Sequence, residues 1–310
     1  LVSAAAKAQM DAVKFQVIDP YQDVQSDAQY RVVWDGEERM VNMREMFERL
    51  HMEPEQWREV IDHCDACGIT FLATCDYIEG IKMLETLDIC AHKIGAWDTT
   101  YKDLIEAIGA TGKPMIVDLG PTTQAEMDEL IAWYMGAGGS VMIPLHDYHT
   151  SVPSQMNMHA VTHLLETLPG PVGYSSPNTE SSLDYVALAL GAQVIEKRLI
   201  ASRSDQVLHA HESMEPAELT AWAKSIRDAE AAMGRSAIIP TDTDLIGAQK
   251  YYRSAVAARD IAKGATLSKA DIAYKRPGTG IAPKDAAALI GKVAVNDIAR
   301  DTLLSVQDVM

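Results

Sequence analysis

Short apolar segments alternate with amphipathic segments along the first three quarters of the chain. Amphipathic stretches such as 122–137 and 216–233 have the spacing of surface helices. Near-continuous apolar runs separated by helices are typical of a parallel sheet that is buried on both faces. The pattern therefore predicts an α/β fold. The apolar runs cover residues 12–18, 69–75, 91–97, 114–120, 140–146, 171–176 and 193–200.

The number of predicted strands favours a barrel. Seven strands within about 235 residues fit a (β/α)8 TIM barrel better than a doubly wound sheet. No strand is followed by the G-x-G-x-x-G of a dinucleotide-binding turn. The sequence opens on a predicted helix, Leu1–Met10, that leads into the first apolar run. Either the first strand of the barrel is missing from the numbered sequence or the sheet is open. Because an open barrel edge would expose apolar backbone, we expect the former.

The character of the chain changes after Gly234. Residues 235–250 are irregular and contain I-I-P-T-D-T-D, which predicts a linker. From residue 251 onwards, short β-like pieces such as S-A-V-A-A-R-D-I and D-I-A-Y-K-R-P alternate with turns at K-G-A-T and P-G-T-G. The sequence therefore predicts a TIM-barrel domain at 1–234, a linker at 235–250 and a small, mainly β domain at 251–310.

Charge is distributed unevenly along the chain, whose net charge is −17. Residues 251–310 hold nine Lys/Arg and six Asp, a net charge of +3, so residues 1–250 carry −20. This acidic body argues against non-specific binding to nucleic acid or to an anionic membrane. An anionic substrate would require a few basic residues concentrated at one place.

No targeting or membrane segment is expected. The sequence lacks a run of about 18 apolar residues, which a membrane-spanning helix needs. Its N-terminus lacks the basic start and apolar stretch of a signal peptide. Cys64 and Cys67 form a lone C-x-x-C in a helical pattern, which favours buried helix residues over a zinc or redox site. The cytoplasm is the expected compartment.

Polar side chains follow the predicted strands at their carboxyl ends, where TIM barrels carry their chemistry. Lys14 and Lys93 lie inside otherwise apolar strands, where a lysine is costly unless it meets an anion. Pairing with a barrel carboxylate such as Asp118 or Glu196 is one explanation, and a phosphate or carboxylate ligand is the other. The candidates are Lys14, Gln16, Thr74, Lys93, Asp98, Asp118, His146, Asp147, Ser175, Ser176, Asn178, Glu196 and Arg198.

Histidines form a second candidate group. His146 and His149 flank Asp147 after one strand, and His209 and His211 follow the last strand. Such a set offers possible metal ligands, although its spacing is not diagnostic. Metal binding and ordinary packing or surface roles both stay open for these residues.

Several of these residues stand in motifs that resemble the sialic acid synthase (N-acetylneuraminate synthase) family. The tail R-S-A-V-A-A-R-D-I-A-K-G-A-T-L-S-K-A-D-I-A-Y-K-R-P-G-T-G-I-A-P, followed by L-I-G-K, is similar to the antifreeze-like (SAF, β-clip) domain that ends these synthases. The barrel is similar at D-A-V-K-F-Q, K-I-G-A-W-D, T-G-K-P-M-I-V, P-V-G-Y-S and L-G-A-Q-V-I-E-K. The resemblance covers nearly the whole chain and implies a TIM barrel followed by a SAF domain.

The resemblance also implies a reaction and its partners. These synthases condense phosphoenolpyruvate with an N-acyl-mannosamine sugar, or its 6-phosphate, to a nonulosonic acid. A divalent metal, Mn or Mg, held by two histidines polarises the sugar aldehyde. The family dimer is domain-swapped, and Arg276 in K-R-P-G matches the arginine that each SAF domain supplies in trans. A basic cap over an acidic barrel would be electrostatically complementary.

Other family positions fall on strand-end residues. Lys14, Thr74 and Lys93 match the lysine, threonine and lysine that bind phosphoenolpyruvate in the family. Asp98 stands where the family has a sugar-binding glutamate and is one methylene shorter. Glu196 matches the glutamate of the family's E-K-H or E-R-H motif.

Departures from the family pattern concern the metal and phosphate sites. Asn178 and Arg198 stand where the family has its two metal-binding histidines, and an arginine does not ligate a divalent metal. The resemblance therefore predicts that the family metal site is absent. Asp118 replaces a serine near the phosphate. Ala96 and Trp97 replace a phosphate-binding serine and a glycine.

We expect some of these changes to compensate one another. One hypothesis is an ion pair between Asp118 and Arg198 across the ends of the strands. Trp97 would then fill space used by substrate or offer a stacking face to a different sugar. A relocated metal is the alternative, with the ligand candidates His146, Asp147, His149, His209 and His211.

Three functions follow from this pattern. The first is a phosphoenolpyruvate-dependent synthase of the sialic acid type, in which Arg198 supplies the charge of the missing metal. The second is an enzyme that acts on a different anionic sugar, and the third is a non-catalytic sugar-binding protein. In the first, the catalytic residues are Glu196, Arg198 and Asp98. The substrate-binding residues are then Lys14, Gln16, Thr74, Lys93, Asp118, Ser175, Ser176, Asn178 and Arg276.

Overall fold

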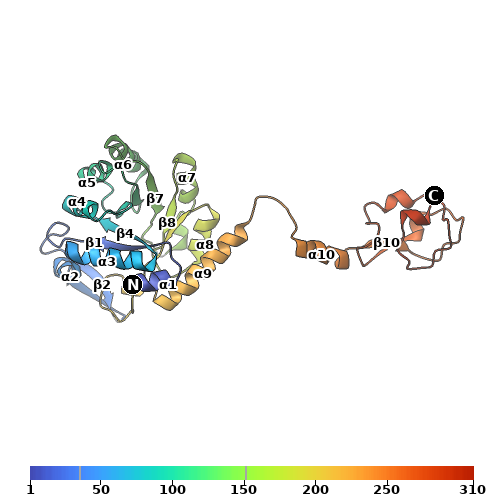
Figure 1. Ribbon diagram of the computed structural model, residues 1–310, viewed down its shortest axis with the longest axis horizontal. Coiled ribbons are helices and arrows are strands. Elements are labelled where there is room, and N and C mark those ends of the chain that lie inside the picture. Colours follow the sequence, from blue (N-terminus) through green and yellow to red (C-terminus); the bar gives the residue numbers. More distant parts are fainter. Residues whose placement is uncertain (35, 151) are drawn as a thin grey trace. The chain divides into compact units, whose positions relative to one another are not determined.

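The computed structural model describes residues 1–34, 36–150 and 152–310, and the chain divides into two compact units, Leu1–Gly234 and Arg235–Met310 (Figure 1). Each unit has a hydrophobic core of its own. None of the helices in these residues is long and apolar enough to cross a membrane.

A parallel sheet forms the centre of the first unit. Its strands pair in the order of the sequence, and each of the seven predicted apolar runs contributes one of them. The predicted parallel α/β architecture is therefore confirmed. Among the described residues, the ladder is open between the last strand and the first. The strands are β1 (Ala12–Val17), β4 (Thr70–Cys75), β5 (His92–Ile94), β6 (Met115–Asp118), β7 (Met142–His146), β8 (Gly173–Ser175) and β9 (Val194–Glu196).

Helices connect these strands and cover the outer face of the curled sheet (Figure 1). Leu84, Ile105 and Leu130 from the helices pack in the same core as the strand residues Ile94 and Val117. Burial of each such side chain stabilises the fold by about 1.5–3 kcal/mol. The helices are α1 (Val2–Lys7), α3 (Pro54–Cys67), α4 (Ile78–Thr86), α5 (Lys102–Gly109), α6 (Gln124–Gly136), α7 (Ala160–Thr167), α8 (Ser182–Ala189) and α9 (Pro216–Met233), with 3-10 turns η1 (Pro153–Gln155) and η2 (Ala210–Glu212).

Helix α3 shows how local sequence sets these boundaries. Glu53 and Gln56 form a reciprocal capping box at its N-terminus, and Pro54 occupies the first helical position. Gly68 ends the helix in the left-handed region with φ 68°. Both cysteines lie on this helix as predicted, but only Cys64 is buried, whereas Cys67 is half-buried.

An insertion after β1 was not predicted. Strands β2 (Gln29–Trp34) and β3 (Glu37–Asn42) form an antiparallel hairpin that leads into helix α2 (Met43–Leu50). Val32 and Phe47 belong to the small core of this insertion, against which Leu208 packs. The indole Nε1 of Trp34 donates to the carbonyl of Val207 at 3.1 Å, which ties the insertion to the segment after β9.

The second unit is small and mainly β, as predicted. Strands β10 (Ser254–Ala257) and β11 (Ile272–Lys275) pair antiparallel, and isolated bridges such as Ile261 to Ile298 extend the pairing. The 3-10 turns η3 (Lys269–Asp271), η4 (Ala286–Leu289) and η5 (Val306–Asp308) complete it. The predicted irregular linker at 235–250 is wrong in part, because Thr241 and Asp244 form a capping box that starts helix α10 (Asp242–Tyr251).

Candidate active site

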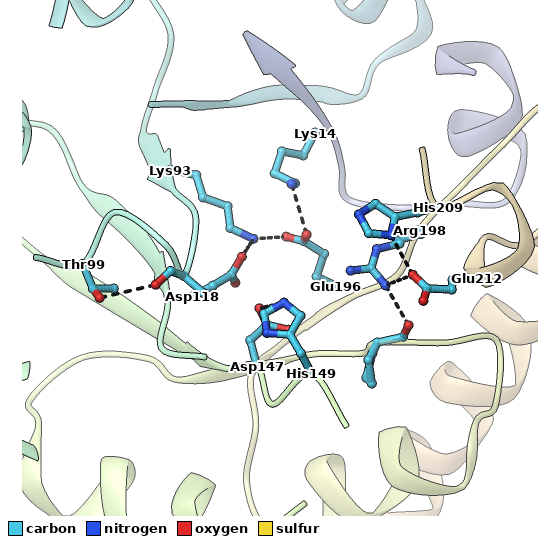
Figure 2. Close-up of polar contacts among 12 residues, drawn as sticks. Lys14, Lys93, Thr99, Asp118, Asp147, His149, Glu196, Arg198, His209 and Glu212 are labelled. Carbon is cyan, nitrogen blue, oxygen red and sulfur yellow. Dashed lines mark hydrogen bonds and ion pairs between the residues drawn. The ribbon is translucent and has the colours of Figure 1, made fainter. Parts of the chain in front are cut away.

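Two lysines, from the strands on either side of β4, meet two carboxylates at the carboxyl ends of the sheet (Figure 2). Lys93 of β5 is only 1% exposed, and its Nζ lies 2.9 Å from Asp118 Oδ2 and 2.5 Å from Glu196 Oε2. Lys14 of β1 lies 3.2 Å from Glu196 Oε1 and donates to Thr74 Oγ1 at 3.2 Å. We call Lys14, Lys93, Asp118 and Glu196 the charge cluster.

Strand register explains why the charge cluster forms. Thr74 pairs with Gln16 on one side and with Lys93 on the other. Because β1, β4 and β5 are parallel, the side chains near their carboxyl ends lie at the same end of the sheet. Of the two explanations that the sequence left open for the lysines, the structure shows pairing with Asp118 and Glu196.

Burial and charge act in opposite directions on the pKa values of these groups. Burial alone would raise the pKa of Glu196, but Lys14 and Lys93 outweigh it and lower this pKa to about 2. Burial raises the pKa of Asp118 to about 7, with repulsion from Glu196 and Asp147 added and attraction from Lys93 opposing it. Glu196 and Asp118 together outweigh the burial of Lys93 and raise its pKa. The two lysines therefore face one carboxyl group whose ionised form is favoured, Glu196, and one whose ionised form is disfavoured, Asp118.

A second acidic group lies beside the charge cluster. Burial, followed by repulsion from Asp76 and Asp23, raises the pKa of Asp98 to about 7. Burial also raises the pKa of Asp76, although a hydrogen bond with Gln16 and the charge of Lys14 oppose this. Asp98 and Gln16 were candidates from the sequence, whereas Asp76 and Asp23 were missed. The position of Asp76 directly after the apolar strand β4 was the available signal.

The predicted ion pair between Asp118 and Arg198 is wrong. Arg198 Nη1 instead lies 3.1 Å from Glu212 Oε2 and donates to the carbonyl of Pro177 at 2.7 Å (Figure 2). Asp118 is already engaged by Lys93. A hydrogen bond from His209, at 2.7 Å, and the charge of Arg198 lower the pKa of Glu212 despite its burial.

The alternative metal site is not assembled either. His146 Nε2 lies 2.6 Å from the carbonyl of Met156, and burial lowers the pKa of this histidine. His149 lies beside Asp147, whereas His209 and His211 lie beside Glu212. Among the described residues, no three His, Cys, Asp or Glu side chains form a group that could hold a metal ion.

The two serines after β8 have different surroundings. Ser175 is buried at the end of the strand and lines the cavity described below. Ser176 Oγ accepts from Lys197 Nζ at 2.8 Å. Lys197 also pairs with the buried Asp184 at 2.8 Å, and Trp222 Nε1 donates to the same carboxylate. This network joins β9, α8 and α9, was missed from the sequence, and gives Ser176 a structural partner.

A cavity of about 1100 Å³ opens at the carboxyl ends and continues between β9 and β1. Lys14, Glu196 and Asp118 line the cavity. Lys93 is fully buried and does not line it, so it affects the cavity through its ion pairs with the two carboxylates. The apolar part of the cavity, away from the charge cluster, is lined by residues of α1, α9, β1 and β9. Other candidates that line the cavity are Gln16, Thr74, Asp147, His149, Ser175, Ser176, Arg198 and His209.

Comparison with known proteins agrees with this division of the chain. Residues 1–237 match the NeuB family and residues 252–310 match the SAF domain. The chain belongs to the NeuB family. The fold prediction, a TIM-barrel-like domain followed by a SAF domain, is confirmed.

Curated relatives of this NeuB-family chain include synthases of several sugar acids. An N,N'-diacetyllegionaminic acid synthase of Legionella pneumophila is 29% identical over 98% of this chain and 88% of its own length. A pseudaminic acid synthase of Campylobacter jejuni is 26% identical over 96% and 87%. The human N-acetylneuraminate-9-phosphate synthase is 24% identical over 81% and 71%.

Solved structures share the NeuB fold. An N-acetylneuraminic acid synthetase of Leptospira borgpetersenii, crystallised with citrate, aligns with a TM-score of 0.69 at 20% identity over 79% of this chain and 82% of its own. A spore coat polysaccharide biosynthesis protein E from Chromobacterium violaceum, described as putative, aligns with a TM-score of 0.71 at 18% identity over 100% and 94%.

The residues of this NeuB chain do not fit the metal that the family resemblance implies. Arg198 is held by Glu212 and by a backbone carbonyl, and a guanidinium is not a ligand for a divalent ion. The side chain of Asn178 accepts from the backbone N–H of Glu180 at 2.9 Å and closes a turn.

In the SAF domain, Arg276 Nε donates to the carbonyl of Tyr251 at 2.7 Å.

Proposed function

We propose that this protein condenses phosphoenolpyruvate with an N-acyl-mannosamine-type sugar to form a nonulosonic acid. The observation that carries the proposal is the charge cluster, which concentrates two lysines at one point of an acidic unit. With Asp118 partly protonated, the cluster has an excess of positive charge beside the cavity. The relatives' activities support the class of reaction.

In this reaction the C3 carbon of phosphoenolpyruvate forms a bond to the aldehyde carbon of the open-chain sugar, and the aldehyde oxygen takes up a proton. Water adds to C2, and the bond from C2 to the phosphate oxygen breaks. Inorganic phosphate leaves and a 2-keto acid remains. One molecule of water is consumed in each turnover.

The charge cluster and the residues around it supply the groups for these steps. Lys14 and Thr74 bind the anionic substrate, and ionised Glu196 keeps both lysines charged and in place. Asp118, with its pKa near 7, donates the proton to the aldehyde oxygen and takes one up afterwards. Arg198 adds fixed positive charge at the rim of the cavity. Asp98 is proposed to bind the sugar.

Two measurements on the full chain test this proposal. Release of inorganic phosphate should require both phosphoenolpyruvate and N-acetylmannosamine, and should continue in the presence of EDTA. Phosphoenolpyruvate should also raise the melting temperature, because a ligand at about 100 times its Kd stabilises the native state by about 2.7 kcal/mol. The variant Lys14→Met should lose this stabilisation.

Lys102→Met is the matched control, because Lys102 is an exposed lysine whose partner is Glu106 on the same helix. This variant should keep the response to phosphoenolpyruvate. If phosphoenolpyruvate neither stabilises the protein nor yields phosphate, the proposal is wrong. Stabilisation by the sugar alone, without phosphate release, would instead support a non-catalytic sugar-binding protein.

A further inference from the structure

An exposed tryptophan lines the cavity beside the charge cluster. Trp97 lies in the loop between β5 and α5, and it is 71% exposed. One face of its indole stacks on the imidazole of His149, with ring centroids 5.0 Å apart and the planes inclined by 23°. A large aromatic side chain that is held by a neighbour but remains open to a cavity is typical of a ligand-binding wall.

The loops that carry these rings are held close together. Gly120 follows β6, and a Cβ atom at this position would lie 2.6 Å from Ala96 Cβ and 3.3 Å from His149 Cε1. Only a residue without a side chain fits there, so the loops after β5, β6 and β7 pack directly against one another. The loops that carry Trp97 and His149 are therefore packed closely together.

The buried carboxylate of Asp147 lies beside His149, and one of its two oxygens has no hydrogen-bond partner in the described part of the chain. Asp147 Oδ2 lies 3.3 Å from His149 Nε2, and the Asp147 side chain is 5% exposed. Its other oxygen, Oδ1, is buried and has no hydrogen-bond partner in the described part of the chain. A buried acceptor without a partner costs free energy unless a ligand or water supplies a donor.

We propose that Trp97, His149 and Asp147 form the wall that binds the second substrate and selects an uncharged N-acyl amino sugar over its phosphate. This inference rests on the proposed function, in which the charge cluster binds phosphoenolpyruvate. Trp97 contacts the apolar C–H face and the acyl methyl group of the sugar. His149 and Asp147 position the indole and line the cavity beside it.

The charges around the cavity disfavour a second phosphate once phosphoenolpyruvate occupies Lys14. The Lys and Arg side chains that line it among the described residues are Lys14, Lys197, Arg198 and Arg227. Each of them already pairs with a carboxylate of the same unit. The wall itself adds the carboxylate of Asp147, which repels a phosphate on the sugar.

Steady-state kinetics of the full chain test the wall. Trp97→Ala should raise the KM for N-acetylmannosamine about tenfold and leave the KM for phosphoenolpyruvate unchanged, because one stacking contact is lost. Trp97→Phe should restore most of the affinity. Tyr101→Ala is the matched control, since Tyr101 is an exposed aromatic residue of the same loop that is not part of the described cavity lining.

Binding is also measured without turnover. N-acetylmannosamine should change the tryptophan fluorescence of the wild type and leave that of Trp97→Phe unchanged. N-acetylmannosamine 6-phosphate and mannose should bind at least about tenfold more weakly. If phosphoenolpyruvate gives neither stabilisation nor phosphate release, the proposed function fails. If both substrates react but Trp97→Ala keeps the wild-type KM, or the phosphate is preferred, the wall alone is wrong.

Discussion

At the scale of single residues, Asp118 makes stability depend on pH. Burial raises its pKa to about 7 from an ordinary value of 3.8, so the native state binds more protons than the unfolded state between these values. Its contribution to stability is therefore present below about pH 4 and is lost as the pH rises through about 7. Asp118→Asn should reduce the fall in the free energy of unfolding between pH 5.5 and 8 by about 1–2 kcal/mol, measured by urea denaturation.

The neighbouring carboxylates define the limits of this test. Asp98 also has a pKa raised to about 7, so part of the fall remains in the variant. Glu196 has a pKa lowered to about 2, so its contribution is lost only as the pH falls toward 2, below the measured range. The fully exposed Asp88 serves as the control, since Asp88→Asn should leave the slope unchanged. An unaltered slope in Asp118→Asn would mean that Asp118 is ionised throughout.

Single residues also show what the sequence could reveal about the site. Lys14 and Lys93 could be found because a lysine in an apolar strand needs an anion, and Glu196 was one of the partners considered. Arg198 was assigned the wrong partner because Glu212 lies on a 3-10 turn whose position depends on the tertiary fold. Spacing along the chain carries no information about such a contact.

At the scale of elements, the apolar strands were predictable because both faces of the sheet are buried and each run is nearly continuous. The hairpin of β2 and β3 was not, since its second strand is largely exposed and reads E-E-R-M-V-N. Helix α10 was missed because its apolar residues are exposed and give no periodic signal. Its capping box at Thr241 and Asp244 was the one local signal of a helix start.

The contact between α5 and α6 yields a prediction at this scale. A Cβ atom on Gly109 would lie 2.5 Å from the carbonyl oxygen of Tyr134 and 2.8 Å from Ala137 Cβ. Gly109→Ala should lower the free energy of unfolding by about 1–3 kcal/mol, because the overlap outweighs the higher helix propensity of alanine. Urea denaturation followed by far-UV circular dichroism measures the change.

Gly136 provides the matched control for this contact. It is the last residue of α6, and a Cβ atom there would meet no described atom within 4 Å. Gly136→Ala should therefore be neutral or should stabilise the protein by up to about 1 kcal/mol. Equal stability of the two variants would show that α5 and α6 separate easily at Gly109.

At the scale of the whole molecule, the change in composition after Gly234 coincides with the division into two compact units. The division was visible in the sequence because the spacing of apolar residues changes from long runs and helices to short β pieces. The gap between β9 and β1 agrees with the count of seven apolar runs, one fewer than a closed eight-stranded barrel needs.

The two separate cores predict that each unit unfolds in its own transition. Leu84 is fully buried in the core of the first unit and Leu289 is 1% exposed in the core of the second. Each Leu→Ala substitution should destabilise its own unit by about 2–5 kcal/mol.

All five tryptophans lie within residues 1–234, so tryptophan fluorescence reports on the first unit alone. Leu84→Ala should shift the fluorescence-monitored urea midpoint, whereas Leu289→Ala should leave it unchanged and accelerate proteolysis within residues 235–310. A fluorescence midpoint that moves equally in both variants would show that the two units unfold together.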